Sequence, residues 1–165
     1  AMPHAELKVE LTPNQNPSVF GLESIEFLVR TNKGSSFEPL KKVASGGELS
    51  RIMLAIKSIL SSSGNLPTII FDEIDTGVSG EVANNMGRIM KKMANHLQVI
   101  SITHLPQIAS KGKQHYKVFK ETKEDTTITK ITQLNRDDRL VEIAQILSGE
   151  NPSQAAIDNA RELLN

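Results

Sequence analysis

Hydrophobic and polar residues alternate with a period of two near the start of the chain. Residues 6–11 (ELKVEL) and 25–29 (IEFLV) follow this pattern, which is typical of half-buried β-strands. Between them, residues 12–17 contain two prolines and two asparagines and predict a turn-rich linker. Residues 31–40, with a glycine, two serines and a proline, predict a second loop.

The period then changes to that of an α-helix. Residues 48–61 carry apolar side chains at helical spacing, and a later helix gathers five of them on one face: Val82, Met86, Ile89, Met90 and Met93. Two apolar runs flank this later helix, residues 68–71 and 97–102, and a loop over residues 76–80 precedes it. We expect both runs to be buried strands, the first of them covered on both faces. Strand, helix and strand with short connections predict a βαβ unit and hence a parallel sheet.

The last part of the chain alternates again and then returns to helical spacing. Residues 115–119 and 127–131 flank a charged loop and predict a β-hairpin. Residues 138–147 and 153–164 predict two closing helices. These elements together indicate an α/β fold, in which helices flank a mostly parallel sheet, antiparallel strands lie near the N-terminus and a hairpin comes late.

The length of the chain suits a single domain. Its 165 residues can enclose one sizeable core, and we expect one domain over residues 1–165. Within it we distinguish strands and loops in residues 1–40, the segments with candidate chemistry in residues 41–112, and the hairpin and last helices in residues 113–165.

Composition narrows the class of protein. Hydrophobic residues make up 38%, and no apolar run approaches the ~20 residues of a membrane span. The first residues, Ala1 to His4, show no basic region followed by an apolar one, so we expect no signal peptide. Cysteine is absent, which excludes disulfides and thiolate metal sites and fits a cytoplasmic protein. Lys plus Arg equals Asp plus Glu at 19 each, so the charge balance does not favour direct binding of nucleic acid.

The first candidate site is Ser45-Gly46-Gly47-Glu48, just ahead of the first predicted helix. One interpretation is a capping box, in which serine and glutamate satisfy free N–H groups at the helix start. The other is an anion site, because adjacent glycines let a ligand approach the backbone and a helix N-terminus favours phosphate. The hydroxyl of Ser45 could serve the same anion.

The second candidate site is the pair Asp72 and Glu73, at the end of the first buried strand. Ligands of open α/β sheets gather at the carboxyl ends of strands. Successive strand residues point to opposite faces, so we expect the two carboxylates to face different ways and to serve two roles. One would hold Mg²⁺, usually through water, and the other would orient an attacking water. The alternative is an acidic cap where the strand exits into a loop.

The third candidate is His104, which follows the next strand along the chain. An imidazole there could bond a phosphate oxygen, and a purely structural histidine is the alternative. His4, His96 and His115 have no such setting, so we expect them to be structural or solvent-facing. A phosphate-binding helix start, a carboxylate pair and a histidine, in this order, form a constellation suited to nucleotide hydrolysis.

These segments resemble the motifs of the ABC ATPase family. Residues 43–51 (VASGGELSR) look like its signature motif, residues 69–73 (IIFDE) like Walker B, residues 74–80 (IDTGVSG) like the D-loop, and residues 102–104 (ITH) like the switch. The longer strings SGGELSRIMLA, FDEIDTGVSG and THLPQIA are similar to the RecN family, the SMC-like proteins of bacterial double-strand-break repair. The resemblance runs from the first predicted strand to the last predicted helix.

One motif of the family is missing. The P-loop, G-x-x-x-x-G-K-[ST], does not occur, and the only Gly-Lys pair, Gly112-Lys113, is followed by Gln114. In RecN-like proteins the P-loop lies in an N-terminal segment, which a long antiparallel coiled coil separates from the part seen here. The resemblance therefore implies the C-terminal half of an ABC-type ATPase head, which we expect to be inactive alone.

The resemblance also implies a mechanism in which two heads sandwich ATP and Mg²⁺. Ser45, Gly46 and Gly47, followed by Glu48 in the same nucleotide-binding motif, would close in trans over the γ-phosphate held by the other head. Asp75, in the D-loop, would couple the two sites across the dimer.

Three further roles follow from the same resemblance. Asp72 would help to position Mg²⁺, Glu73 would be the general base or water-orienting residue, and His104 would contact and sense the γ-phosphate. The implied partners are the N-terminal P-loop half of the same protein, a second head in a homodimer, and DNA through the complete protein. We expect a cytoplasmic, nucleoid-associated protein with no membrane contact.

Two other classes of function stay open. A transporter nucleotide-binding domain carries its P-loop on the same contiguous domain, whereas only 44 residues precede Ser45 here and they are predicted to form strands and loops. A non-enzymatic interaction module is the second alternative, since the chain could act by offering its apolar sheet surfaces to a partner.

Overall fold

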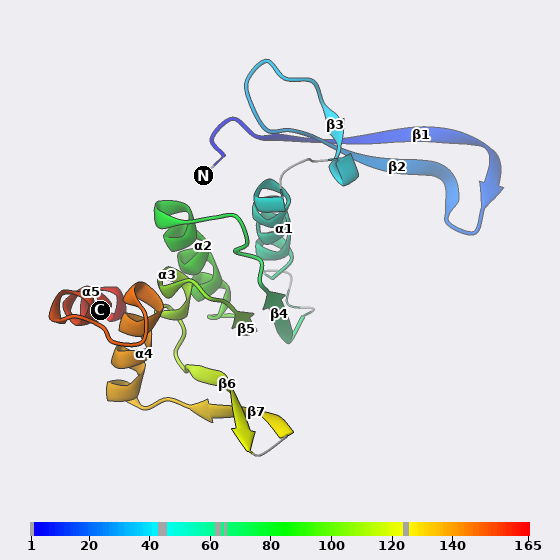
Figure 1. Cartoon of the computed structure of the whole chain (residues 1–165). Coiled ribbons are helices and arrows are strands. Elements are labelled where there is room, and N and C mark those ends of the chain that lie inside the picture. Colours follow the sequence, from blue (N-terminus) through cyan, green and yellow to red (C-terminus); the bar gives the residue numbers. More distant parts are fainter. Residues whose placement is uncertain (1, 43–45, 62–63, 65, 124–125) are drawn as a thin grey trace. The chain divides into compact units, whose positions relative to one another are not determined.

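The computed structural model describes residues 2–42, 46–61, 64, 66–123 and 126–165 (Figure 1). The chain divides into two compact units, residues 1–56 and 57–165, and each is described by itself. The boundary falls inside helix α1 (Gly46–Ser61), which begins slightly before the predicted start at residue 48.

A long antiparallel hairpin dominates the first unit. Strand β1 (Glu6–Ser18) pairs with β2 (Gly21–Arg30), and the short β3 (Glu38–Pro39) adds to the other edge of β2 (Figure 1). The predicted linker over residues 12–17 is wrong, because β1 continues through it with a register shift between Pro13 and Ser18. Both prolines of this stretch lie on an edge strand, where a missing N–H donor is tolerated.

The hairpin has one apolar face. Leu7 pairs with Val29, Val9 with Phe27, and Leu11 with Ile25, and directly opposed residues of an antiparallel pair lie on the same face. The alternation predicted half-buried strands, but the only buried residues of β1 and β2 are Leu28 and Val29. The sequence pattern is typical of a sheet with one face packed against other residues. In the described part of the chain, most of the apolar face of this hairpin is exposed.

The second unit contains the predicted βαβ unit. Strands β4 (Thr68–Asp72) and β5 (Gln98–Ile102) pair in parallel, joined through helix α2 (Gly80–Met93), which confirms the parallel arrangement. On α2 the buried residues are Ala83, Met86, Gly87, Met90 and Met93. Ile89, expected on this face, is exposed, and the close-packed Gly87 lies there instead.

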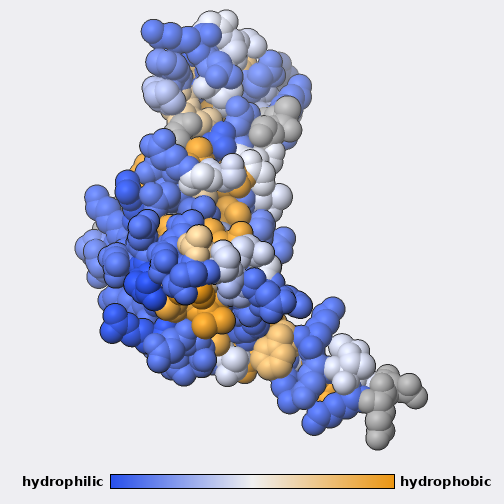
Figure 2. All heavy atoms as spheres, turned by 60° about the vertical axis from the view of Figure 1, so that its left-hand side comes forward, coloured by the Kyte–Doolittle hydropathy of each residue, from blue (hydrophilic) through white to orange (hydrophobic). Residues whose placement is uncertain are grey.

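The β4–β5 sheet is covered on one face. In β4, Ile69 and Phe71 are buried, while Ile70 between them is 60% exposed. Ile100 and Ile102 of β5 are exposed as well. The prediction that residues 68–71 are buried on both faces is therefore wrong, because a two-stranded sheet offers its second apolar face to solvent when nothing packs on it. Figure 2 shows hydrophobic residues at the surface of the molecule among mostly hydrophilic ones.

The rest of the second unit follows the prediction closely. Strands β6 (Tyr116–Lys123) and β7 (Thr126–Gln133) form the predicted hairpin, and α4 (Arg136–Ser148) and α5 (Gln154–Leu164) are the two predicted helices. A short helix not expected from the sequence, α3 (Pro106–Ala109), follows β5.

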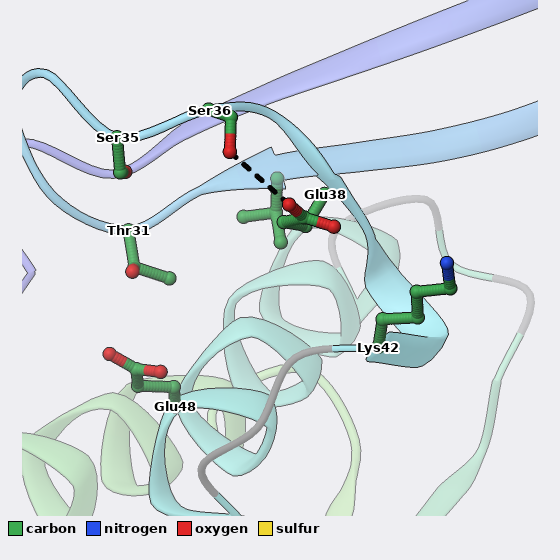
Figure 3. A pocket seen from close by; sticks show the side chains of 7 residues that line it. Thr31, Ser35, Ser36, Glu38, Lys42 and Glu48 are labelled. Carbon is green, nitrogen blue, oxygen red and sulfur yellow. Dashed lines mark hydrogen bonds between the residues drawn. The ribbon is translucent and has the colours of Figure 1, made fainter.

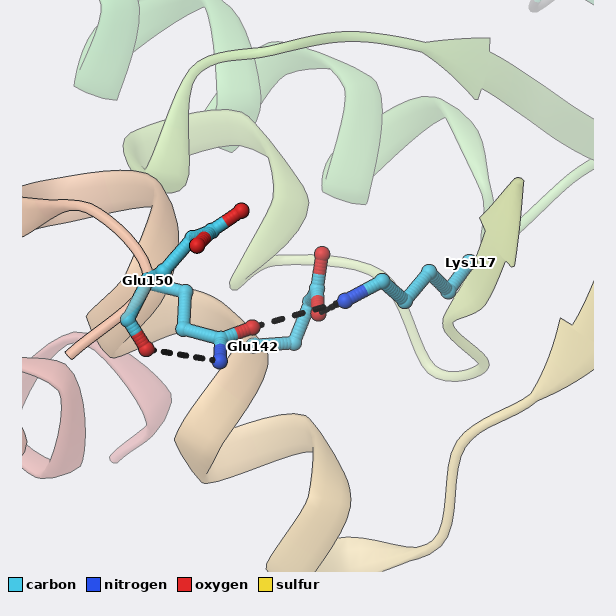
Figure 4. Close-up of polar contacts among 4 residues, drawn as sticks. Lys117, Glu142 and Glu150 are labelled. Atoms are coloured by element: carbon cyan, nitrogen blue, oxygen red, sulfur yellow. Dashed lines mark hydrogen bonds and ion pairs between the residues drawn. The ribbon is translucent and has the colours of Figure 1, made fainter. Parts of the chain in front are cut away.

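Side chains cap the start of α4 and join this helix to the β6–β7 hairpin. The Asn135 side chain accepts the backbone N–H groups of Asp137 and Asp138, each at 2.9 Å, at the start of α4. Lys117 of β6 forms an ion pair with Glu142 of α4, and its ammonium lies 3.4 Å from the Gln145 amide oxygen (Figure 4).

Candidate functional site

The signature segment begins helix α1. Ser45 lies outside the described residues, together with Val43 and Ala44. Gly46 and Gly47 occupy the first positions of α1, and Glu48 is the acidic residue of its first turn. A Cβ added at Gly46 would meet no described atom within 4 Å outside its chain neighbours and its own helix backbone, so the backbone at Gly46 is open to close approach, whereas Gly47 is buried.

A pocket of about 210 Å³ lies in the first unit, between the end of β2, the loop that follows it and the first turn of α1 (Figure 3). Its lining includes Glu38 and Glu48 against a single cation, Lys42. Ser36 donates a hydrogen bond to the Glu38 carboxylate at 3.2 Å. Two carboxylates disfavour a phosphate, so this pocket does not suit the anion expected at the signature.

Asp72 and Glu73 are both exposed at the carboxyl end of β4. Asp72 is the last strand residue and lies opposite Ile102 of β5. Glu73 has already left the strand and adopts a left-handed backbone with φ of 45°. Strand alternation therefore does not set the direction of the Glu73 side chain. The prediction that the Asp72 and Glu73 carboxylates face different ways rested on this alternation and has no support from it here.

Hydrogen bonds hold the left-handed turn at Glu73. Its N–H donates to the Ile102 carbonyl at 3.1 Å, and its own carbonyl accepts both the N–H and the hydroxyl of Thr76, at 3.1 and 2.9 Å. A non-glycine residue in this conformation costs ~1–2 kcal/mol. Such strain is typical of functional sites, where the surrounding contacts keep the backbone in place.

Asp75 is the buried carboxylate of the site, with 1% of its surface exposed. Its Oδ2 accepts a hydrogen bond from the Thr103 hydroxyl, while Oδ1 has no partner in the described part of the chain. The Asp75 carbonyl accepts the Val78 N–H at 3.1 Å and closes the next turn of the D-loop segment. The side chain thus points into this chain.

His104 is exposed just beyond the end of β5. The residue before it, Thr103, accepts the Leu105 N–H at 3.0 Å through its hydroxyl and so shapes the turn that carries the imidazole. Thr103 was not among the predicted site residues, and its only signal in the sequence was a hydroxyl side chain beside the candidate histidine. The structure brings Asp72, Glu73, Asp75 and His104 to the ends of two adjacent parallel strands, and the signature residues belong to the other unit.

The other three histidines differ in their burial. His4 and His96 are exposed. Burial lowers the pKa of His115, and the nearby charge of Arg139 lowers the pKa further. His115 lies just before β6, close to the charged residues of α4, which favours the structural one of the two alternatives expected from the sequence.

The donor set fits a magnesium ion that is shared with a nucleotide. Within the described ranges, no group of three or more His, Cys, Asp or Glu side chains could hold a metal ion. At nucleotide sites Mg²⁺ usually takes one or two protein carboxylates, completed by waters and phosphate oxygens. The exposed carboxylate of Asp72 can supply that one contact, directly or through water.

Comparison with known proteins identifies sequence relatives. The chain is 41% identical to the DNA repair protein RecN of Haemophilus influenzae over 165 residues, 99% of this chain and 30% of the relative. It is 41% identical to RecN of Deinococcus radiodurans, over 99% of this chain and 28% of the relative, and 44% identical to RecN of Bacillus subtilis, over 87% and 25%. The chain thus spans less than a third of the length of these relatives. No protein-family model matches it.

Solved structures share the fold at low sequence identity. A chain from a study of ATP-driven dimerization and DNA-stimulated activation of SMC ATPases matches with a TM-score of 0.61 and 18% identity, over 90% of this chain and 85% of that one. The Smc head domain of Pyrococcus yayanosii, with a coiled coil and joint, matches with a TM-score of 0.64 and 17% identity, over 99% and 27%. These matches confirm the α/β head fold. In the described part of the chain, no helix is long and apolar enough to cross a membrane.

Proposed function

We propose that this chain, which corresponds over nearly its whole length to a segment of the RecN proteins, supplies the hydrolytic and trans-acting residues of an SMC-like ATPase head in DNA repair. The observation that carries the proposal is the position of the exposed Asp72, Glu73 and His104 at the ends of β4 and β5. Ligands of open α/β sheets bind at this edge.

In the proposed reaction each side chain has a separate task. Magnesium would neutralise charge on the phosphate oxygens of ATP, and Asp72 would hold it through a water ligand. Glu73 would orient the attacking water or accept its proton, and His104 would bond a γ-phosphate oxygen. Catalysis of phosphoryl transfer rests mainly on such positioning and charge stabilisation.

The signature segment would act on the nucleotide held by a second head. Ser45, Gly46 and Gly47, with Glu48, would close over the γ-phosphate, which agrees with the open backbone at Gly46. Free N–H groups at a helix start favour an anion. Asp75 would link the D-loop to the rest of the site. In this proposal residues 1–165 work as one head segment, although they fold as two units.

The proposed partners follow from the missing P-loop. The segment of the complete protein that carries the P-loop would bind the phosphates, two heads would dimerise around ATP, and DNA would be bound by the complete protein. A role in DNA repair would place it with the nucleoid in the cytoplasm. The relatives and the solved structures described above are RecN proteins and SMC heads, which does not favour a transporter domain.

A change of Glu73→Gln in the complete, RecN-length protein tests the proposal. We expect ATP binding and head dimerisation to persist while ATP hydrolysis falls about a hundredfold or more, because the water loses its base. Glu81→Gln, in the exposed first turn of α2, is the matched control and should hydrolyse ATP at the normal rate. Normal hydrolysis by Glu73→Gln would remove Glu73 from the reaction.

A non-enzymatic interaction module is the second candidate, and the exposed apolar faces of the β1–β2 hairpin and of the β4–β5 sheet favour it. Under this hypothesis the chain would bind its partner with the same affinity with or without ATP. Measuring the binding of the P-loop segment by calorimetry, with and without ATP and Mg²⁺, separates the two functions.

A further inference from the structure

The buried Asp75 and the half-buried Thr103 are close in the chain to the two exposed groups of the site. Asp75 follows Glu73 by two positions, and Thr103 directly precedes His104. Their side chains share a hydrogen bond, so the turn after β4 is joined to the turn after β5. We infer that Asp75 and Thr103 are positioning residues that hold Glu73 and His104 in register with each other. This inference rests on the proposed function for its catalytic consequence.

The hydrogen bonds form a continuous connection through the site. The Leu105 N–H donates to the Thr103 hydroxyl at 3.0 Å, and that hydroxyl donates to Asp75 Oδ2. A second link runs beside it, from the Glu73 N–H to the Ile102 carbonyl at 3.1 Å. Because both links join the same two turns, neither turn can shift alone without breaking one of them.

Burial makes the Asp75–Thr103 link sensitive to the loss of either partner. A carboxylate that is 1% exposed must find donors within the protein, since little water reaches it. In the described part of the chain, the Thr103 hydroxyl is the only donor to its side chain, and Oδ1 has none. Removing that hydroxyl would leave both oxygens unpaired, and the carboxylate would turn toward solvent and take the D-loop turn with it.

The roles of the buried and the exposed carboxylates are thus different. Glu73 and Asp72 are exposed and can touch a ligand, whereas the Asp75 side chain is closed off within this chain. A coupling between two heads through Asp75 would therefore act through the turn that it holds, and its side chain would not contact the partner head directly.

Amide hydrogen exchange in the 165-residue chain tests the link without any ATP. Thr103→Val removes the hydroxyl at nearly constant shape, and exchange of the Glu73 and Leu105 amides should accelerate about ten- to a hundredfold. Thr103→Ser keeps the hydroxyl and should restore the slow exchange. Thr122→Val is the matched control, because Thr122 shares an exposed hydroxyl pair with Thr127 on the β6–β7 hairpin. Its substitution should leave both amides unchanged.

Two results would overturn the positioning role in this experiment. One is wild-type exchange at Glu73 and Leu105 that is already as fast as in an unstructured peptide. The other is unchanged exchange in Thr103→Val. If Thr103→Val does not fold, Asp75→Leu replaces it, since leucine has nearly the shape of aspartate and accepts no hydrogen bond. Faster exchange at the Glu73 amide supports the link, and unchanged exchange there contradicts it.

ATP hydrolysis by the complete protein tests the catalytic consequence. Thr103→Val should lower kcat about tenfold with KM for ATP within about twofold, because the reacting groups are displaced while the nucleotide contacts persist. Thr103→Ser should recover kcat. If the wild-type protein shows no Glu73-dependent hydrolysis while the exchange results hold, the proposed function fails and the link stands. If hydrolysis depends on Glu73 and Thr103→Val leaves kcat unchanged, the positioning role fails alone.

Discussion

The last helices and the first hairpin differ in how their apolar residues are covered. In the second unit, Ile143, Ala144 and Ala160 are fully buried between α4 and α5. In the first unit, the apolar residues of β1 are about half exposed, and the hairpin turn leaves Val19 and Phe20 almost wholly exposed, at 95% and 94%. One region encloses its own core, whereas the other presents an apolar face without one.

This difference shows which part of the fold this segment completes by itself. Both regions have regular apolar periodicity, so the pattern alone does not distinguish them. The burial of the β4–β5 sheet is intermediate between that of these two regions, since Phe71 is buried on one face and Ile70 is exposed on the other. Burial of apolar area is the main driving force of folding, so we expect the rest of a RecN-length protein to cover the exposed faces.

The largest expected effect is a core substitution in the self-contained region. Ile143→Ala should lower the free energy of unfolding of the 165-residue chain by about 2–5 kcal/mol, because it opens a cavity between α4 and α5. Ile25→Ala, on the exposed face of the hairpin, should change it by only about 0.5 kcal/mol. Urea unfolding followed by circular dichroism measures both.

The same pair of variants sharpens the comparison in the complete protein. There Ile25→Ala should become more destabilising than in the isolated chain, because the hairpin face gains a cover. An equal, small effect of Ile25→Ala in both proteins would mean that this face stays exposed, which contradicts the cover expected in the complete protein.

Arg139 gives the next largest effect, since it joins α4 to the end of α3. Its guanidinium donates to the carbonyls of Ala109, Ser110 and Gly112, at 3.3, 2.8 and 2.6 Å. Arg139→Met should destabilise the chain by about 1–3 kcal/mol, because partly buried carbonyls lose their donor. The exposed Arg136 provides the control Arg136→Met, and equal urea midpoints for the two variants would contradict this role.

The pH dependence of stability gives the smallest expected effect. The pKa of His115 is lowered in the folded protein, first by burial and then by the charge of Arg139. Below the ordinary value of about 6.5 the unfolded chain therefore binds more protons than the folded one. His115 therefore makes its full contribution to stability above about pH 6.5. This contribution is lost as the pH falls from 6.5 through the lowered pKa that His115 has in the folded protein.

Comparing wild type with His115→Asn isolates this contribution. The difference between their urea midpoints should change between pH 8 and pH 5.5, with the wild type losing more stability on acidification. His96→Asn, at an exposed histidine, controls for the substitution itself. A constant difference between wild type and His115→Asn across this range would rule out the proposed effect.

Sequence periodicity was sufficient to predict the strands and the longer helices of the second unit, but not the short helix α3. Helical spacing and two short apolar runs predicted α2 between β4 and β5, and hence the parallel pair. It could not predict the exposure of Ile70, because burial depends on what packs against the sheet. The length of β1 was missed for a related reason, since pairing with β2 extends it through residues that favour turns locally.

The candidate site was predictable in outline only. The predicted βαβ unit placed Asp72, Glu73 and His104 after strands of one parallel sheet, and these strands, β4 and β5, are adjacent. The left-handed turn at Glu73 was not predictable, because no glycine marks it and tertiary hydrogen bonds impose it. The bond between Asp75 and Thr103 depends on the register of β4 against β5, which sequence spacing does not define.

Steady-state ATP hydrolysis tests the central claim most directly. The 165-residue chain, the segment that carries the P-loop, their mixture, and the mixture with Glu73→Gln would be assayed side by side with Mg²⁺. We predict hydrolysis by the mixture alone, and its loss with Glu73→Gln. Hydrolysis by the 165-residue chain by itself, or an equal rate with Glu73→Gln in the mixture, would contradict the claim.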